Sequence, residues 1–325
     1  MSDDRLRGQF DMTDQFSDQF VPAAGVLLAA RHRAHRAAEP LLPERYEDDD
    51  AAAAEVSALW GSNAASGVVA LRAGRMIGFL IGTRREDAVW GANVWVEPAG
   101  HAAEDAEVVR DLYAAASADW VEAGRTRHYV GVPASDASLV DAWFRLGFGC
   151  QHALGIRETP AVEWPSCTRR AEQRDVDALV EINPFLVRHQ NAAPVFAAAP
   201  LDDDEEGLRR DLTDDIVNPA FGVLVAERDG RVVGVFVVAA IELSSNHAGV
   251  ARPDDAKLLA WAATRPEVQG SGAGLDLTNA AFAWAREEGC RVIVVDWRET
   301  NLSASRFWPA RGFRRTFLRL YRSIP

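Results

Sequence analysis

The feature that most constrains the fold is an internal repeat. Residues 69–78 read VALRAGRMIG and residues 225–234 read VAERDGRVVG, so six of ten positions are identical at an offset of 156. Each copy places a turn dipeptide, Ala73-Gly74 or Asp229-Gly230, between two apolar runs. This pattern is typical of a β-hairpin. A repeat with so long a period, in a chain of 325 residues, predicts two similar domains.

A second pair of segments repeats as well. GRTRHYVGVPASDASLVDAWFRLGFG begins at Gly124, and GCRVIVVDWRETNLSASRFWPARGFR begins at Gly289. In both, the glycine of a Gly-Phe pair, Gly147 or Gly312, follows the first glycine at an offset of 23 positions. The first glycine suits the end of a helix, and an apolar strand and a short helix follow it. Each half therefore predicts the order helix, hairpin, strand, helix, strand, helix, strand.

This order mixes antiparallel hairpins with parallel crossovers, which indicates an α/β fold. We expect two tandem domains, each a mixed, mostly antiparallel sheet flanked by helices. Two prolines in ETPAVEWPSC, residues 158–167, mark a linker between them. The predicted domains are residues 1–160 and 161–325.

The composition of the chain limits the classes of partner and the cellular compartment that can be expected. The chain carries 48 acidic and 35 basic residues, for a net charge of −13, which disfavours nucleic acid because phosphate binding needs a basic surface. Its three cysteines have no metal-ligand spacing, so we expect no metal site and a reducing compartment. The start of the chain is polar, and the apolar run over residues 21–30 is too short to cross a membrane. A cytoplasmic protein without a membrane partner is expected.

The second half contains a glycine-rich stretch, RPEVQGSGAGLDLTNAAF, over residues 265–282. A mononucleotide P-loop would end in Gly-Lys-Ser/Thr, but the only lysine of the chain is Lys257. A dinucleotide loop reads G-x-G-x-x-G, whereas Gly270, Gly272 and Gly274 give G-x-G-x-G. Glycines before a helix present backbone amides to an anion. On these residues alone, an anion site and a plain tight turn both stay open.

The surrounding residues show a family resemblance. PEVQGSGAG resembles the acetyl-CoA loop of the GNAT acyltransferase superfamily, Q/R-x-x-G-x-G/A, with Gln269, Gly272 and Gly274 at the signature positions. NLSASRFWPARGF, which begins at Asn301, resembles the family's N-x-x-A-x-x-F-Y-x-x-x-G-F segment. The resemblance covers most of residues 168–325, and the repeat extends it to residues 55–157 as fold only.

The resemblance implies how acetyl-CoA would bind. The pyrophosphate would rest on the amides of the loop, and the pantetheine arm would pair with the strand before it. A backbone N–H near Ala262 would polarise the thioester carbonyl. Asn301 would hold the pantetheine from the other side of a splayed strand pair, or cap a helix, or do both. The implied cofactor-binding residues are Ala262, Thr264, Val268, Gln269, Gly270, Ser271, Gly272, Ala273, Gly274 and Asn301.

The sequence departs from the family where catalysis is concerned. Many members place a tyrosine that protonates the leaving thiolate where this chain has Trp308, and indole cannot act as an acid. Trp143 takes the same place in the first half, so the matched pair indicates core packing. Ser305 and Tyr321 are the remaining candidates for a catalytic acid. The strand KLLAWAAT offers only Lys257 and no carboxylate as base, so the amine would lose its proton through a water held by Glu242 or because the pKa of the substrate amine is itself low.

The first half lacks the loop. It reads VEPAGHAAEDAEVV at the corresponding place, with acidic residues around the helix start and neither the signature glutamine nor the glycines. We expect residues 1–160 to bind no acetyl-CoA. The chain as a whole predicts an acetyl-CoA-dependent N-acetyltransferase acting on a primary amine of a small molecule or peptide. The alternative is an acyl-CoA-binding sensor without efficient transfer, and a homodimer is compatible with either.

Overall fold

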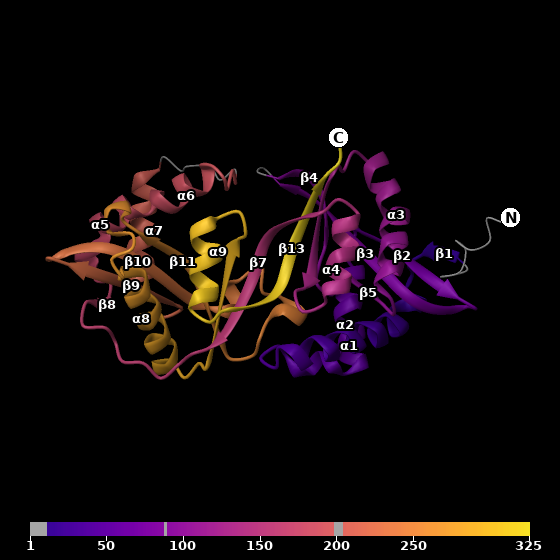
Figure 1. Cartoon of the computed structure of the whole chain (residues 1–325), viewed down its shortest axis with the longest axis horizontal. Helices are drawn as coiled ribbons and strands as arrows, with labels where there is room; N and C mark the ends of the chain where they lie inside the picture. The colour runs from indigo at the N-terminus through magenta and orange to yellow at the C-terminus, as the bar shows by residue number, and fades with distance from the viewer. Residues whose placement is uncertain (1–11, 88–89, 198–203) are drawn as a thin grey trace. The chain divides into compact units, whose positions relative to one another are not determined.

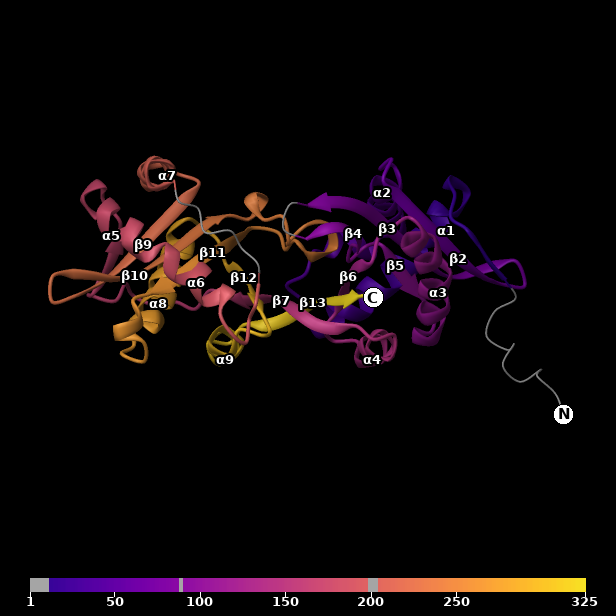
Figure 2. The same cartoon turned by 90° about the horizontal axis from the view of Figure 1, so that it is seen from above.

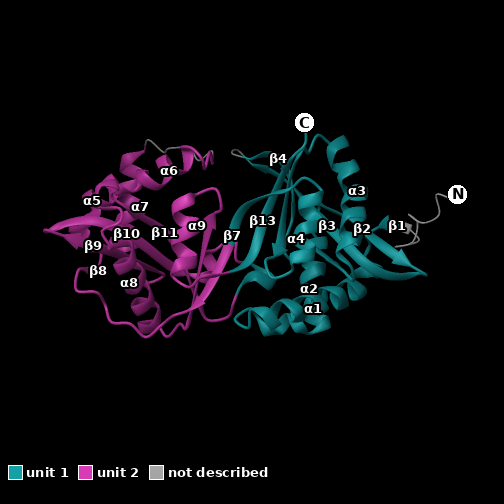
Figure 3. Ribbon diagram, in the orientation of Figure 1, with its two compact units in different colours: residues 1–153, 248–252, 315–325 teal, residues 154–247, 253–314 magenta. Residues whose placement is uncertain are grey.

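The computed structural model describes residues 12–87, 90–197 and 204–325. The chain divides into two compact units, drawn in teal and magenta in Figure 3. Unit 1 comprises residues up to 153 together with residues 248–252 and 315–325, and unit 2 comprises residues 154–247 and 253–314. The last strand of the chain therefore belongs to unit 1, on the other side of the predicted linker from most of that unit.

Unit 1 is a sheet with helices on both faces (Figures 1 and 2). The strands β1-β2-β3-β4-β6-β13 are neighbours in that order, and β5 pairs with β3. Every registered pair is antiparallel except β4 with β6. The elements are β1 (Met12–Gln15), α1 (Val21–Ala38), α2 (Asp49–Trp60), β2 (Ala65–Arg72), β3 (Arg75–Asp87), β4 (Gly91–Val96), β5 (His101–Ala103), α3 (Ala106–Glu122), β6 (Arg127–Pro133), α4 (Ala137–Arg145) and β13 (Arg314–Ser323).

Unit 2 has the same architecture. The strands β12-β11-β10-β9-β8 are neighbours in that order, and only β11 and β12 are parallel among its registered pairs. Figure 2 shows α5 and α7 on one face of this sheet and α8 and α9 on the other. The elements are β8 (Thr168–Arg170), α5 (Val176–Ile182), α6 (Pro184–Asn191), α7 (Glu205–Val217), β9 (Phe221–Arg228), β10 (Arg231–Ala240), β11 (Ala256–Thr264), α8 (Ala273–Glu287), β12 (Val292–Arg298) and α9 (Leu302–Ala310). The remaining strand, β7 (Gly149–Glu158), begins in unit 1 and ends in unit 2.

The two predicted hairpins are confirmed, and their turns have the same backbone geometry. Ala73 and Gly74 have φ values of 50° and 74°, and Asp229 and Gly230 have φ values of 51° and 74°. Positive φ at both central residues is the requirement of a type I′ turn, whose twist matches that of the flanking strands. The fold class expected from the repeat, two tandem mixed α/β domains, is therefore the one observed.

Alternation along β9 and β10 places the core of unit 2 on both sheet faces. Val223, Val225 and Val235 pack with Leu179 of α5 and other apolar side chains on one face. On the other face a Cβ built on Gly222 would lie 2.5 Å from the Trp284 ring of α8. A glycine is required there because the indole approaches the strand backbone so closely. This contact sets the distance of α8 from the sheet, and with it the position of the segment before α8.

Candidate functional site

The parallel strands β11 and β12 pair over only part of their length. The registered partners run from Ala256 with Val292 to Leu259 with Val295, after which β11 continues to Thr264 without a registered partner in β12. The pairing of β11 with β10 also shifts here, since Leu259 opposes Val238 and Trp261 opposes Val237. Ala260 is the extra residue of this bulge, and bulges bend a strand and increase its twist.

Residues 260–264 consequently form a strand edge that faces away from β10 and is not paired with β12. Backbone N–H and C=O groups on such an edge are available to an extended ligand, which can pair with them as an added strand would. The predicted contacts Ala262 and Thr264 lie on this edge and are half-buried. The splayed strand pair that the family resemblance implied is therefore present in the strand register.

The segment after β11 is an open loop. Pro266–Val268 form one 3₁₀ turn, and Gly272, with φ 94° and ψ −8°, is the residue before α8. Ser271 N donates to Val268 O (3.1 Å) and Leu275 N to Gly272 O (2.9 Å). Within the described chain, no backbone acceptor is found for the amides of Gly270, Gly272, Ala273 and Gly274.

The same loop leaves space in front of its amides. A Cβ built on Gly270 or on Gly272 would meet no heavy atom within 4 Å, and both glycines are exposed, as are Gln269 and Ser271. No side chain caps the start of α8. Unpaired amides at a helix N-terminus carry partial positive charge, so this loop has the donors and the space that a phosphate group requires.

Two contacts fix the loop at its ends. Arg265, only 5% exposed, donates from Nε to Val232 O (3.0 Å) and from Nη2 to Glu181 Oε2 (2.6 Å). At the other end, a Cβ built on Gly274 would lie 3.3 Å from the Phe307 ring of α9. The one carboxylate in the first turn of α8, Asp276, is paired with Arg228 at 2.5 Å. The loop is held in place without placing an unpaired negative charge beside its amides.

Asn301 lies between the end of β12 and the start of α9. It is buried, with 7% of its surface exposed, and its Oδ1 accepts from Ser303 N and Ala304 N at 3.1 Å each. It therefore caps α9, one of the two roles expected of it. The Nε2 of His189, on α6, lies 3.1 Å from the same Oδ1.

Residues 187–313 match the model of the acetyltransferase (GNAT) family. This span contains β11, the loop, α8 and Asn301. These residues form a GNAT-family domain.

Known structures extend the fold likeness to both units. A GCN5-related N-acetyltransferase from Sphaerobacter thermophilus aligns over 96% of this chain and 95% of its own, with a TM-score of 0.57 and 15% identity. A fungal multi-domain GH3 β-N-acetylglucosaminidase with a GCN5-related glucosamine N-acetyltransferase region aligns over 97% of this chain and 38% of its own chain, with a TM-score of 0.52 and 15% identity. At these identities the likeness is one of fold. No curated protein matches this chain by sequence.

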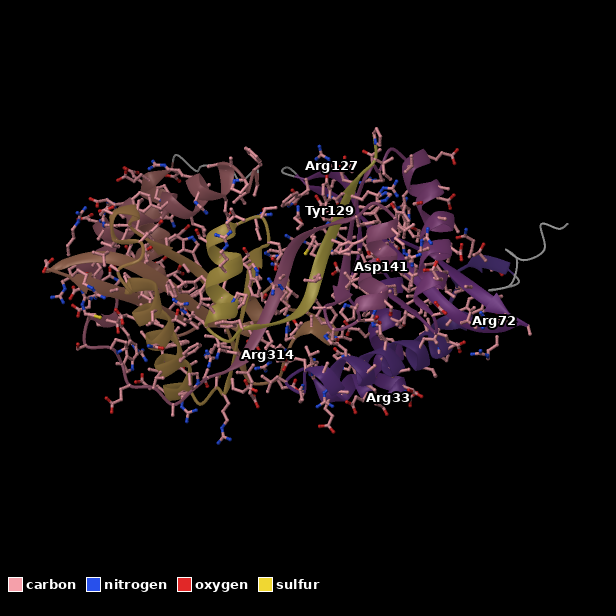
Figure 4. The ribbon with its side chains drawn as sticks, viewed as in Figure 1. Arg33, Arg72, Arg127, Tyr129, Asp141 and Arg314 are labelled. Carbon is pink, nitrogen blue, oxygen red and sulfur yellow. The ribbon has the colours of Figure 1, made fainter. Side chains whose placement is uncertain are left out.

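The candidate catalytic residues fall in different units. Ser305 is half-buried on α9 of the GNAT domain, and its hydroxyl has no hydrogen-bond partner in the described parts of the chain. Tyr321 is on β13 in unit 1, where its ring packs at 4.9 Å from Tyr129, labelled in Figure 4. Trp308 is 6% exposed and packs against Phe236 of β10 at 5.9 Å, as expected of a core residue.

Within the described residues, no contact of Lys257 or Glu242, the residues considered in connection with a base, with the splayed edge of β11 is found. Lys257 lies at the paired end of β11, and its Nζ is 4.0 Å from Glu288 Oε2 and 4.9 Å from the Trp284 ring. Glu242 is exposed in the 3₁₀ turn after β10. Burial raises the pKa of the nearby Cys290 thiol, while the charge of Lys257 lowers this pKa and that of Glu242 raises it. The sequence alone indicated no functional role for His189. This histidine follows an arginine, as His32 does in the first half.

Unit 1 differs from the GNAT domain at the corresponding place. Its strand β4 ends at Val96, the last residue paired with β6. Its helix α3 is capped by Asp105, whose Oδ1 accepts from Glu107 N at 2.8 Å. Arg31 of α1 donates from its guanidinium to the carbonyls of Pro98, in the turn after β4, and of His101, the first residue of β5. Among the described residues of unit 1, β4 leaves no strand edge beyond its pairing with β6, and the amide of Glu107 at the start of α3 is capped.

No helix in residues 12–87, 90–197 or 204–325 combines the length and the apolar composition needed to cross a bilayer.

Proposed function

We propose that this chain is an acetyl-CoA-dependent N-acetyltransferase whose GNAT domain, in unit 2, binds the acyl donor. The observation that carries the proposal is the open loop, in which left-handed Gly272 exposes unpaired amides immediately after a splayed strand. The anion and the extended arm of coenzyme A need these two features side by side. The space in front of Gly270 and Gly272 fits a diphosphate that must approach the backbone closely.

Each part of the site in unit 2 would have its own role in acetyl-CoA binding and acetyl transfer. Within the loop of residues 269–274, the unpaired amides of Gly270, Gly272, Ala273 and Gly274 hold the pyrophosphate, with Val268 and Thr264 at the entry to the loop. The unpaired edge of β11 orients the pantetheine, and the N–H near Ala262 stabilises negative charge on the thioester oxygen. Asn301 contacts the pantetheine arm of coenzyme A from the side of β12. The acceptor is a primary amine of a small molecule or a peptide, which attacks the thioester carbonyl directly and releases the thiol.

A second candidate is an acyl-CoA sensor that transfers poorly. It is favoured by one observation, since Trp308 is packed into the core where many family members carry a tyrosine acid. A thiolate is already a fair leaving group, with a reference pKa of about 8.5. Positioning alone supplies several orders of magnitude in rate. We therefore prefer the enzyme, and steady thiol release with any amine of a panel would exclude the sensor.

The test uses a matched pair of glycines on α8. Gly272 (φ 94°) precedes the helix and Gly289 (φ 79°) follows it, and a Cβ on either meets nothing within 4 Å. Gly272→Glu and Gly289→Glu therefore add the same charge and a similar backbone strain of about 1–2 kcal/mol. Calorimetry should show acetyl-CoA affinity at least tenfold weaker for Gly272→Glu and unchanged for Gly289→Glu. Absent binding to the wild type, or equal effects of the two variants, would refute the proposal.

A further inference from the structure

His189 lies on α6, the helix that contacts β11, and bonds to Asn301 beyond the end of β12. On α6 it stands four residues after Phe185, which packs in the cluster that includes Trp261 and Ala263 of β11. Residues four apart share a helix face, so His189 is on the face of α6 that meets β11. Its Nε2 reaches Asn301 Oδ1, at 3.1 Å, beyond the end of β12. The imidazole of His189 thus links α6, the helix next to β11, to Asn301, which follows β12.

The hydrogen bonds around Asn301 assign the tautomer of His189. Asn301 Oδ1 accepts from the backbone N–H groups of Ser303 and Ala304, so this atom is an acceptor. His189 Nε2 must then donate, and a neutral imidazole that carries its proton on Nε2 has its lone pair on Nδ1. The side chain is exposed, and Nδ1 has no partner within the described residues. An oriented, solvent-accessible base remains.

The repeat shows that this arrangement is not inherited packing. His32, at a comparable place on α1, is buried, and its Nε2 lies 2.8 Å from Pro43 O. Burial lowers the pKa of His32, which favours its neutral form. The counterpart of Asn301 in the second repeated segment is Asp136, and its carboxylate accepts from Leu139 N and Ser138 Oγ. Within the described residues, His32 thus makes no hydrogen bond to Asp136, unlike His189 to Asn301.

We propose that His189 is the general base of the transfer, with Asn301 fixing its tautomer; this rests on the proposed acetyltransferase function. Residues 260–264, which border the expected thioester, contain no titratable side chain. Nδ1 of His189 takes one proton from the acceptor ammonium group, and the amine nitrogen then attacks the carbonyl carbon. The C–N bond forms as the C–S bond breaks, and the thiolate takes up the second proton that the nitrogen loses. The products are the amide, the free thiol and an imidazolium that returns its proton to water.

Three variants separate a base from a structural contact. His189→Gln keeps an amide donor that can bind Asn301 Oδ1 but has no basic nitrogen, His189→Ala removes both, and Arg188→Ala is the exposed neighbour on the same helix. With an amine that the wild type acetylates, both His189 variants should lose about 10²-fold or more in kcat. Arg188→Ala should stay within twofold. Acetyl-CoA affinity by calorimetry should stay within twofold in all three, and added imidazole should restore His189→Ala at least tenfold.

Two outcomes would overturn the inference alone. One is wild-type kcat in His189→Gln, which would reduce His189 to a hydrogen-bond donor. The other is a neutral His189 protonated on Nδ1, which ¹⁵N NMR of the chain without acetyl-CoA detects independently of activity. A wild type that binds acetyl-CoA but acetylates no amine would instead overturn the proposed function, and this inference with it.

Discussion

The ring of His35 packs edge-on against Phe317, with centroids 4.7 Å apart and planes at 81°. This contact joins α1 to β13, the strand that the end of the chain contributes to unit 1. Burial, with the nearby Arg31 charge, lowers the pKa of His35 to about 3. Burial likewise lowers the pKa of His101 to about 3. Two neutral histidines are thus built into the part of unit 1 that holds the last strand.

Acid should therefore destabilise the fold well above the range in which carboxylates titrate. An unfolded histidine has a pKa of about 6.5, so between pH 6.5 and 3 the unfolded chain binds protons that folded His35 and His101 do not. The stability they provide is fully present above pH 6.5 and is lost as the pH falls. Each histidine lowers the free energy of unfolding by about 1.4 kcal/mol per pH unit in this window.

Urea unfolding at several pH values from 8 to 4 measures this slope. His35→Phe should make the slope shallower by about 1.4 kcal/mol per pH unit, whatever it does to stability at pH 8. Some slope should remain, because burial also lowers the pKa of His128 and His32. An unchanged slope in His35→Phe would show that His35 is protonated in the folded chain.

Arg31 should contribute to stability, in contrast to its repeat counterpart Arg188. The guanidinium of Arg31 donates to two carbonyls, its Nε is buried, and burial lowers its pKa to about 10. Arg31→Met leaves both carbonyls unpaired at about 1–3 kcal/mol each, offset in part by the buried charge it removes. We expect a net loss of about 2–4 kcal/mol by urea unfolding. Exposed Arg188→Met should change stability by less than about 0.5 kcal/mol, and equal effects of the two would contradict this account.

The sequence predicted the elements of the fold well because local chemistry specifies them. Asp229-Gly230 adopts the type I′ turn that its residue types favour, and Gly74 supplies the second left-handed position in the other hairpin, where Ala73 has the less common φ of 50°. Gly124 and Gly289 follow α3 and α8 with φ values of 75° and 79°, as C-terminal glycines do. The loop between β11 and α8 was also recognisable, because no side chain could replace its glycines without strain.

Pairing between strands that are distant in sequence could not be read in the same way. The repeat gives both halves a similar last strand, β7 and β13, and alternation alone does not tell which sheet each joins. In the structure Leu318 of β13 opposes Val132 of β6, in unit 1. The His189–Asn301 hydrogen bond was hidden for a related reason, since a single imidazole in an exposed helix carries no periodic signal. Only the placement of α6 on β11 brings the two residues together.

The roles of Ser305 and Tyr321, the two candidates for the catalytic acid, can be distinguished by removing one hydroxyl group at a time. Ser305 lies on α9 in the same compact unit as the loop, with no hydrogen-bond partner there, whereas Tyr321 packs on Tyr129 in unit 1. We expect Ser305→Ala to lower kcat about tenfold or more at unchanged acetyl-CoA affinity, and Tyr321→Phe to stay within threefold. Steady-state kinetics on one acceptor amine checks both, and the reverse ranking would make Tyr321 the acid.

One chain should bind one molecule of acetyl-CoA. In unit 1 the start of α3 is closed by the carboxylate of Asp105, and Arg31 donates to the carbonyls of Pro98 and His101, which precede this helix. Calorimetry should therefore give a stoichiometry near one for the wild type and no remaining site in Gly272→Glu. Asp105→Gly uncaps α3 at a cost of a few tenths of a kcal/mol, yet it should create no second site, because β4 still ends at Val96 without a free edge. A stoichiometry near two for the wild type, or a site of wild-type affinity in Gly272→Glu, would show that unit 1 also binds the acyl donor.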